Sequence, residues 1–173
     1  MHLQRILMAI LVIITSNAYA NDQTVLYNYK SLSLQLASKA AWGALNECRR
    51  QGYSVAVAVI DRGGNLQVYL RDQFAGPHTM ETAFRKAWTA NSFRQSTAVL
   101  ADLLQKGTIP NQVQHNPGAL LVGGGEIIQA NGATIGGIGV SGAPPGKSEK
   151  DSIDGSCAKA GILAIEEELV FSQ

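Results

Sequence analysis

The segment between residues 71 and 97 combines side chains that together can hold a flat ligand carrying negative charge. Cations can pair with acidic groups, an imidazole or thioether can donate to a metal, and aromatic rings can cover an apolar face. The cations are Arg71, Arg85, Lys86 and Arg94, the candidate donors are His78 and Met80, and ring surfaces lie at Phe84, Trp88 and Phe93. This mixture suits a planar, apolar ligand with two acidic groups.

Haem is a ligand of this kind, because it needs apolar contact on its faces, an axial donor and positive charge near its propionates. A purely structural interpretation accounts for the same residues. In that interpretation Phe84 and Trp88 belong to the core, while Arg85 and Lys86 lie on the solvated face of a helix. Composition alone favours the structural interpretation.

Charge and motifs exclude several other functions. The 173 residues hold 14 Lys and Arg against 13 Asp and Glu, so no basic surplus is present to neutralise a nucleic-acid backbone. No Walker loop, G-x-S-x-G elbow, H-E-x-x-H or C-x-x-C motif is present, and the glycine-rich segments at 123–125 and 136–137 open expected strands rather than helices. The sequence therefore gives little support to nucleotide binding, classical hydrolysis or a dinucleotide cofactor.

The first twenty residues have the pattern of a secretory signal peptide. Arg5 precedes an apolar run over residues 6–14, and Ala18-Tyr19-Ala20 forms an A-x-A cleavage box. About nine apolar residues span only ~14 Å of helix, too little to cross a bilayer. We therefore expect cleavage after Ala20, export to the periplasm or the extracellular space, and a single domain over residues 21–173.

The two cysteines, Cys48 and Cys157, are separated by 109 positions. An exported protein meets oxidising conditions, under which the pair can form a disulfide. Each cysteine also falls on the apolar face of an expected helix, a position that is equally compatible with a buried free thiol. The sequence leaves both alternatives open.

Hydrophobic periodicity predicts an order of helix, two strands, two helices, three strands and helix. The helices are expected over 33–50, 79–93, from Ser96 onward, and from 151 or 152 through 169. The strands are expected over 53–60, 66–70, 119–122, 127–129 and 134–140. Short hairpins between them predict an α+β domain with a five-stranded antiparallel sheet and flanking helices.

Capping and glycine patterns add detail to this prediction. Ser31 or Ser33 can cap the first helix, and Thr79 can cap the second. Ser96 or Thr97 can cap the third. The glycines in the strand over 134–140 leave bare backbone, which indicates that another element or a ligand approaches closely.

Several short motifs, in their order and spacing, resemble the GlcG/HbpS family of haem-binding and haem-degrading proteins. The resemblance runs from about Leu34 to the C-terminal helix. The motifs are the segments 57–65, Arg71-Asp72, Ala75-Gly76-Pro77, 85–90, 121–125 and 135–144.

The resemblance implies a profilin-like or PAS-like domain that assembles into oligomers such as octamers. It also implies an exported protein that binds haem, degrades it with peroxide and releases iron, and that can serve a membrane sensor. The iron-linked threonine of the exported branch aligns with Thr97. The residues expected to hold haem are then Thr97, His78, Arg71, Arg85, Lys86 and Phe93.

One feature of the exported branch is missing. Its acidic iron-binding pair follows a D/E-x-x-E pattern, but Phe84 stands three positions after Glu81. Of the histidines after the signal peptide, we expect His78 rather than His115 to serve the ligand, because His115 falls in a loop bounded by prolines.

Two rival functions remain at this stage. The chain can be a binding module or small enzyme for an organic acid of the glycolate type, with Arg71, Lys86 and the amides of glycine loops holding a carboxylate. It can also be an accessory subunit whose sheet binds only protein partners. Titration with haemin separates the first hypothesis from both.

Overall fold

The computed structural model describes residues 28–171. The predicted signal peptide, residues 1–20, lies outside the described residues. Within the described part, no helix is long and apolar enough to cross a membrane.

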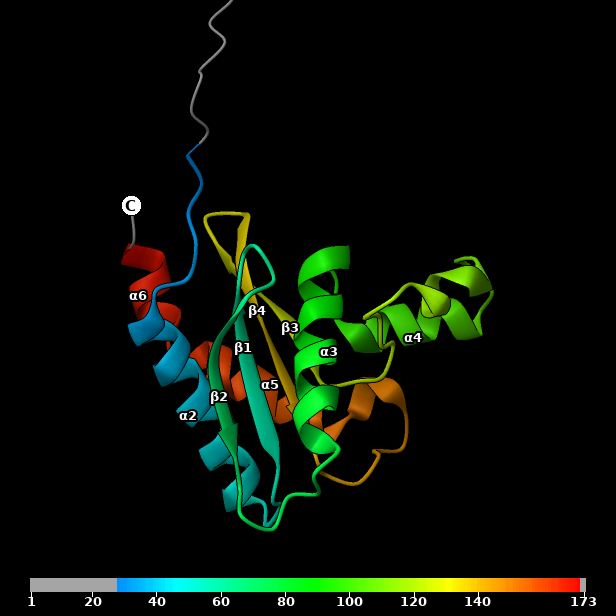
Figure 1. The fold of residues 1–173 in the computed structure, drawn as a ribbon, viewed down its shortest axis with the longest axis horizontal. Helices are drawn as coiled ribbons and strands as arrows, with labels where there is room; N and C mark the ends of the chain where they lie inside the picture. Colours follow the sequence, from blue (N-terminus) through cyan, green and yellow to red (C-terminus); the bar gives the residue numbers. More distant parts are fainter. Residues whose placement is uncertain (1–27, 172–173) are drawn as a thin grey trace, which may run out of the picture.

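Four antiparallel strands form one sheet in the order β2-β1-β4-β3 (Figure 1). The strands are β1 (Ala56–Asp61), β2 (Leu66–Arg71), β3 (Gly125–Ala130) and β4 (Ala133–Ser141). The helices are α2 (Leu34–Arg50), α3 (Thr79–Phe93), α4 (Thr97–Gln105), α5 (Ile153–Leu163) and α6 (Glu166–Phe171), with short 3-10 turns η1 (Asn111–His115) and η2 (Glu149–Asp151). The α+β class predicted from the sequence is correct.

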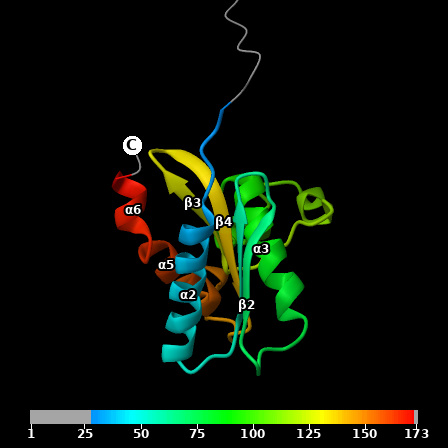
Figure 2. The same ribbon diagram turned by 60° about the vertical axis from the view of Figure 1, so that its left-hand side comes forward.

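Helices cover the two faces of this sheet. The helix α3 packs on one face, and α2 and α5 pack together on the other (Figure 2). The main core lies between the sheet and the α2–α5 pair, and includes Leu45, Val57, Val59, Ile128 and Ile138. A smaller apolar cluster of Ala56, Ala58 and Ala83 lies beneath α3.

The prediction of five strands is wrong, because residues 119–122 form no strand. The backbone of this segment forms hydrogen bonds with side chains of α3 instead. The Leu120 N–H donates to Thr89 Oγ1 at 2.8 Å, and Arg85 Nη2 donates to the Ala119 carbonyl at 2.7 Å. Because these backbone N–H and C=O groups already have hydrogen-bond partners on α3, the segment does not have to pair with a strand.

The first three helices begin where the sequence predicts, with one correction. Ser33 and Ser96 cap α2 and α4, each through its side-chain oxygen. Thr79 is inside α3, and His78 occupies the N-cap position without a side-chain cap bond. Thr79 and Lys86 are buried, whereas Met80, one of the candidate donors, is exposed.

The single C-terminal helix expected through Leu169 is two helices. Ser152 caps α5, as predicted, but that helix ends at Leu163. A new helix, α6, begins with Glu166, Glu167 and Glu168 in its first turn. Acidic residues stabilise the positive end of a helix, so three consecutive glutamates favour a fresh start here.

The glycines of β4 let α3 lie against the strand backbone to backbone. A Cβ placed on Gly139 would overlap the Ala83 carbonyl, and one on Gly137 would lie 2.8 Å from the Ala87 carbonyl oxygen. The close approach predicted from these glycines is therefore made by α3, which is held tightly on the sheet.

Cys48 of α2 and Cys157 of α5 form a disulfide in the structure, and both are fully buried. The link joins the two helices that cover the same face of the sheet. Of the two alternatives that the sequence left open, the structure has the paired one.

Replacing both cysteines by alanine is expected to lower the free energy of unfolding by about 3–5 kcal/mol, because the link restrains a long loop of the unfolded chain. The measurement is urea unfolding of the wild type and the double variant, each with and without a reducing agent. Reductant should destabilise the wild type and leave the variant unchanged. A wild type indifferent to reductant would contradict the pairing.

Candidate functional site

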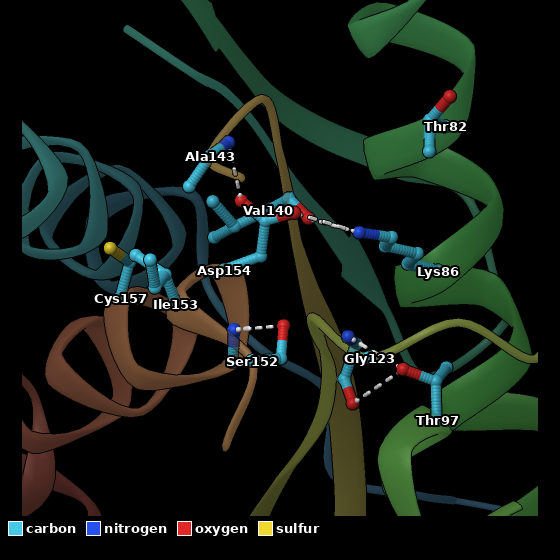
Figure 3. Close-up of polar contacts among 12 residues, drawn as sticks. Thr82, Lys86, Thr97, Gly123, Val140, Ala143, Ser152, Ile153, Asp154 and Cys157 are labelled. Atoms are coloured by element: carbon cyan, nitrogen blue, oxygen red, sulfur yellow. Dashed lines mark hydrogen bonds and ion pairs between the residues drawn. The ribbon is translucent and has the colours of Figure 1, made fainter. Parts of the chain in front are cut away.

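A buried ion pair joins the two faces of the sheet. Lys86 of α3 and Asp154 of α5 are only 3% and 7% exposed, and Lys86 Nζ lies 2.9 Å from Asp154 Oδ2. Lys86 Nζ also donates to the Val140 carbonyl at 3.1 Å, at the end of β4 (Figure 3). A buried ammonium group needs such partners to offset its lost hydration. The interpretation of Lys86 as part of a solvated helix face is therefore wrong.

The second oxygen of Asp154 positions the segment after β4. Asp154 Oδ1 accepts the Ala143 N–H at 3.0 Å (Figure 3). The one carboxylate thus holds α3 through Lys86 and the segment 141–149 through Ala143. Between these parts lies an open cleft of about 610 Å³.

The cleft presents both apolar and charged groups. Val122, Ala143, Pro144 and Pro145 give it apolar walls. Its charged and titratable lining residues are His78, Lys86, Lys147, Glu149 and Asp154. The exposed His78 ring stands at the start of α3, close to Gly76. A ligand in this cleft would meet an imidazole, the exposed Lys147 ammonium group and a proline wall, beside the paired Lys86 and Asp154.

The glycine loop before β3 is already engaged by the chain itself. The Gly123 N–H donates to Glu149 Oε2, and the Gly125 N–H donates to Thr97 Oγ1 at 2.9 Å. Gly124 has φ of +125° and lies so close that a Cβ would meet the Val140 carbonyl and Lys86 Nζ. These two amides therefore stabilise the loop, and are not vacant donors for a ligand carboxylate.

Thr97 is fully buried at the first turn of α4. Its hydroxyl also donates to the Gly125 carbonyl at 3.4 Å, so both of its hydrogen-bonding roles serve β3. It is not among the residues that line the cleft. The structure thus gives Thr97 a role in joining α4 to the sheet and offers no accessible oxygen there for an iron. The helix cap at this position is Ser96.

The remaining predicted ligands divide between the cleft and the scaffold. His78 and Lys86 line the cleft, whereas Arg71, Arg85 and Phe93 do not. Arg71 donates to the Ala75 carbonyl and secures the loop before α3. Arg85 holds the segment at Ala119. Phe93 is half-buried at the end of α3. No cluster of metal-ligating side chains occurs among the described residues.

Comparison with known proteins identifies the family. The model of the family described as "Haem degrading protein HbpS-like" matches residues 32–162. The chain belongs to this HbpS-like family. The resemblance drawn from the sequence motifs is confirmed, and the matched residues include both ends of the buried ion pair.

Solved structures of the HbpS-like fold agree with this assignment. A crystal structure of a double mutant of Streptomyces reticuli HbpS is 38% identical, with a TM-score of 0.73, covering 81% of this chain and 90% of that chain. A crystal structure of a PduOC:heme complex is 28% identical, with a TM-score of 0.69, covering 78% of this chain and 95% of that chain.

One curated relative is a larger protein. The corrinoid adenosyltransferase PduO of Salmonella typhimurium is 32% identical over 124 residues, which are 70% of this chain and 35% of that protein. The chain therefore spans about a third of that relative.

Sequence reasoning missed Asp154, Glu149 and the wall formed by residues 141–149. Asp154 lies in the first turn of a helix, where an acidic residue has a sufficient local explanation. Its pairing with Lys86 spans 68 positions, which no local pattern reveals. Prolines at 144 and 145 are typical of a loop, but they do not reveal that this loop lies near α3.

Lys86→Met is expected to lower the free energy of unfolding by about 3–5 kcal/mol, because Asp154 would remain buried and charged without its partner. The double variant Lys86→Met/Asp154→Asn should recover much of this loss, since the amide can still accept from Ala143. Urea unfolding of the four proteins in this cycle measures the coupling. Additive effects would contradict a buried pair.

The buried carboxyl group of Glu126, in β3, predicts how the free energy of unfolding depends on pH. Burial raises the pKa of its carboxyl group, against a weaker opposing effect of Lys159, whose Nζ lies 3.8 Å away. The folded state then binds the proton more tightly than the unfolded state, so this group favours folding at low pH. The contribution is lost as pH rises from the ordinary pKa of a glutamate through the raised value. Glu126→Gln should therefore stabilise the protein at pH 7 and have little effect near pH 4, as urea unfolding at both values would show.

Proposed function

We propose that this protein binds haem in the cleft between α3 and the segment 141–149. The observation that carries the proposal is the presence of an imidazole, an exposed ammonium group and an apolar wall in one open cleft. Membership of the HbpS-like family and the likeness to a PduOC:heme complex support haem as the ligand.

The residues of the cleft fit the chemistry of haem. Val122, Pro144 and Pro145 offer apolar contact to a ring face, and burial of that face favours binding. Lys147 is exposed at the rim, where it can pair with a propionate. Lys86 adds positive charge at depth, although Asp154 already holds its ammonium group.

His78 is the residue that we assign as the donor to the iron. It lines the cleft, and its side chain makes no cap bond to α3. Thr97, the donor implied by the family resemblance, is buried and bonded to Gly125. Haem would supply the redox chemistry, and the chain would supply its orientation and the charge around its propionates.

His78→Ala is expected to weaken haemin binding by about tenfold or more and to shift the Soret band, because the axial donor is removed. His115→Ala is the matched control, since that residue lies exposed in η1, outside the cleft lining. Thr97→Val should lower stability by about 1 kcal/mol and leave the band in place. A shifted band in Thr97→Val with an unchanged one in His78→Ala would overturn the assignment.

We further propose that the chain is exported with cleavage after Ala20, assembles with copies of itself and degrades haem with peroxide. Its exposed apolar residues, among them Phe74, Leu163 and Phe171, are consistent with self-association.

Loss of Soret absorbance and release of iron after addition of peroxide would test degradation. Light scattering would test assembly, and intact mass of the secreted protein would test cleavage.

A further inference from the structure

An open apolar groove lies at the end of the molecule where α6 meets the segment before α2. It has a volume of about 320 Å³, and its apolar lining residues are Leu32, Leu36, Ala130, Ile135 and Leu169. Figures 1 and 2 both show α6 beside the start of α2 and the segment that precedes it. The groove shares no lining residue with the haem cleft.

Large apolar side chains are exposed beside this groove. Leu34 is 57% exposed at the start of α2, and Val170 and Phe171 are 58% and 81% exposed at the end of α6. Each of them directly follows or precedes a residue that lines the groove or adjoins it along the chain. Exposed apolar side chains gathered around an apolar groove are typical of an interaction surface.

The direction of Phe171 shows that it does not fill the groove of its own chain. Leu169 lines the groove and is 7% exposed. Phe171 follows two positions later on α6, which places it about 200° around the helix from Leu169. The ring therefore points away from its own groove, toward whatever the molecule contacts.

A second copy of the chain fits both parts of this surface. A two-fold axis at this end would bring the Phe171 ring of each copy to the groove of the other. Symmetric dimers use such self-complementary surfaces, in which the same two features meet twice. An aromatic ring in an apolar groove is also the kind of contact that dominates the free energy of association.

The charges of the surface complement each other in the same arrangement. Glu167 and Phe171 are both exposed and lie one turn apart on the same face of α6. Lys30 is exposed and lines the groove, and no carboxylate is among the lining residues. A Phe171 ring that enters a groove thus brings Glu167 toward a lysine.

We propose that residues 30–36 and α6 form the surface through which two copies of this chain associate. Phe171 of each copy packs in the groove of the other, and Glu167 pairs with the partner's Lys30. This inference rests on the self-association proposed above and names its surface. It does not depend on haem, because the groove and the cleft have no residue in common.

Phe171→Ser is expected to weaken self-association at least tenfold, because it removes the ring that fills the groove. Phe74→Ser is the matched control and should leave association unchanged. Phe74 is 82% exposed, in the loop between β2 and α3, at the opposite end of the molecule from α6 (Figure 1). Sedimentation equilibrium over a range of concentrations measures association, and circular dichroism and haemin titration check that the fold and the cleft are unchanged.

Reversing the two charges provides an independent test. Glu167→Lys and Lys30→Glu should each weaken association about threefold to tenfold, because each places like charges together across the interface. The double variant, which restores an opposite pair, should recover most of the affinity. A merely local role of either residue would not produce this recovery.

The outcomes separate this surface from self-association in general. An oligomer that Phe171→Ser leaves unchanged, or a double charge variant no better than the single ones, would overturn this surface and leave self-association standing. A monomeric wild type would overturn both. In that monomer, a lower free energy of unfolding of Phe171→Ser would assign the surface to residues 21–27 of the same chain, and an unchanged one to a foreign partner.

Discussion

The geometry of the cleft depends on the buried contact between Lys86 and Asp154. The two residues come from helices on opposite faces of the sheet, and they meet at the end of β4, where the Val140 carbonyl accepts from the same ammonium group. Because a buried charge is tolerated only with good partners, this contact fixes where α3, β4 and α5 can lie relative to one another. Asp154 then extends the constraint to the wall of the cleft through the Ala143 N–H.

Several polar residues that look available for a ligand are committed to this scaffold. Thr97 joins α4 to β3, Arg85 fastens the segment before the glycine loop, and Glu149 accepts the Gly123 N–H. Each of them satisfies a backbone group that no strand or helix satisfies. The groups left for a ligand in the cleft are consequently few, and the exposed His78 and Lys147 are among them.

The sequence predicts the fold better than the site, for a physical reason. Periodicity and caps are local, so α2, α3 and β2 are predicted nearly to the residue, and the start of β1 is predicted three residues too early. Residues 119–122 have the composition of a strand, but their hydrogen bonds go to Thr89 and Arg85, more than twenty positions earlier in the chain. In the same way, Lys86 has the local pattern of a surface residue until Asp154 is placed beside it. What decides a site is pairing between distant segments, which composition does not record.

The glycines of β4 also fix the position of α3 along the strand. Ala83 and Ala87 are one helical turn apart, about 6 Å along α3, and Gly139 and Gly137 are two residues apart, about 6.6 Å along the strand. The two repeats nearly coincide, so successive carbonyls of the helix lie over successive glycines. The helix cannot slide along the strand, because a shift would bring one of these carbonyls against a residue that has a side chain. Lys86, midway along α3, is therefore kept at a fixed position relative to the end of β4 and to the cleft.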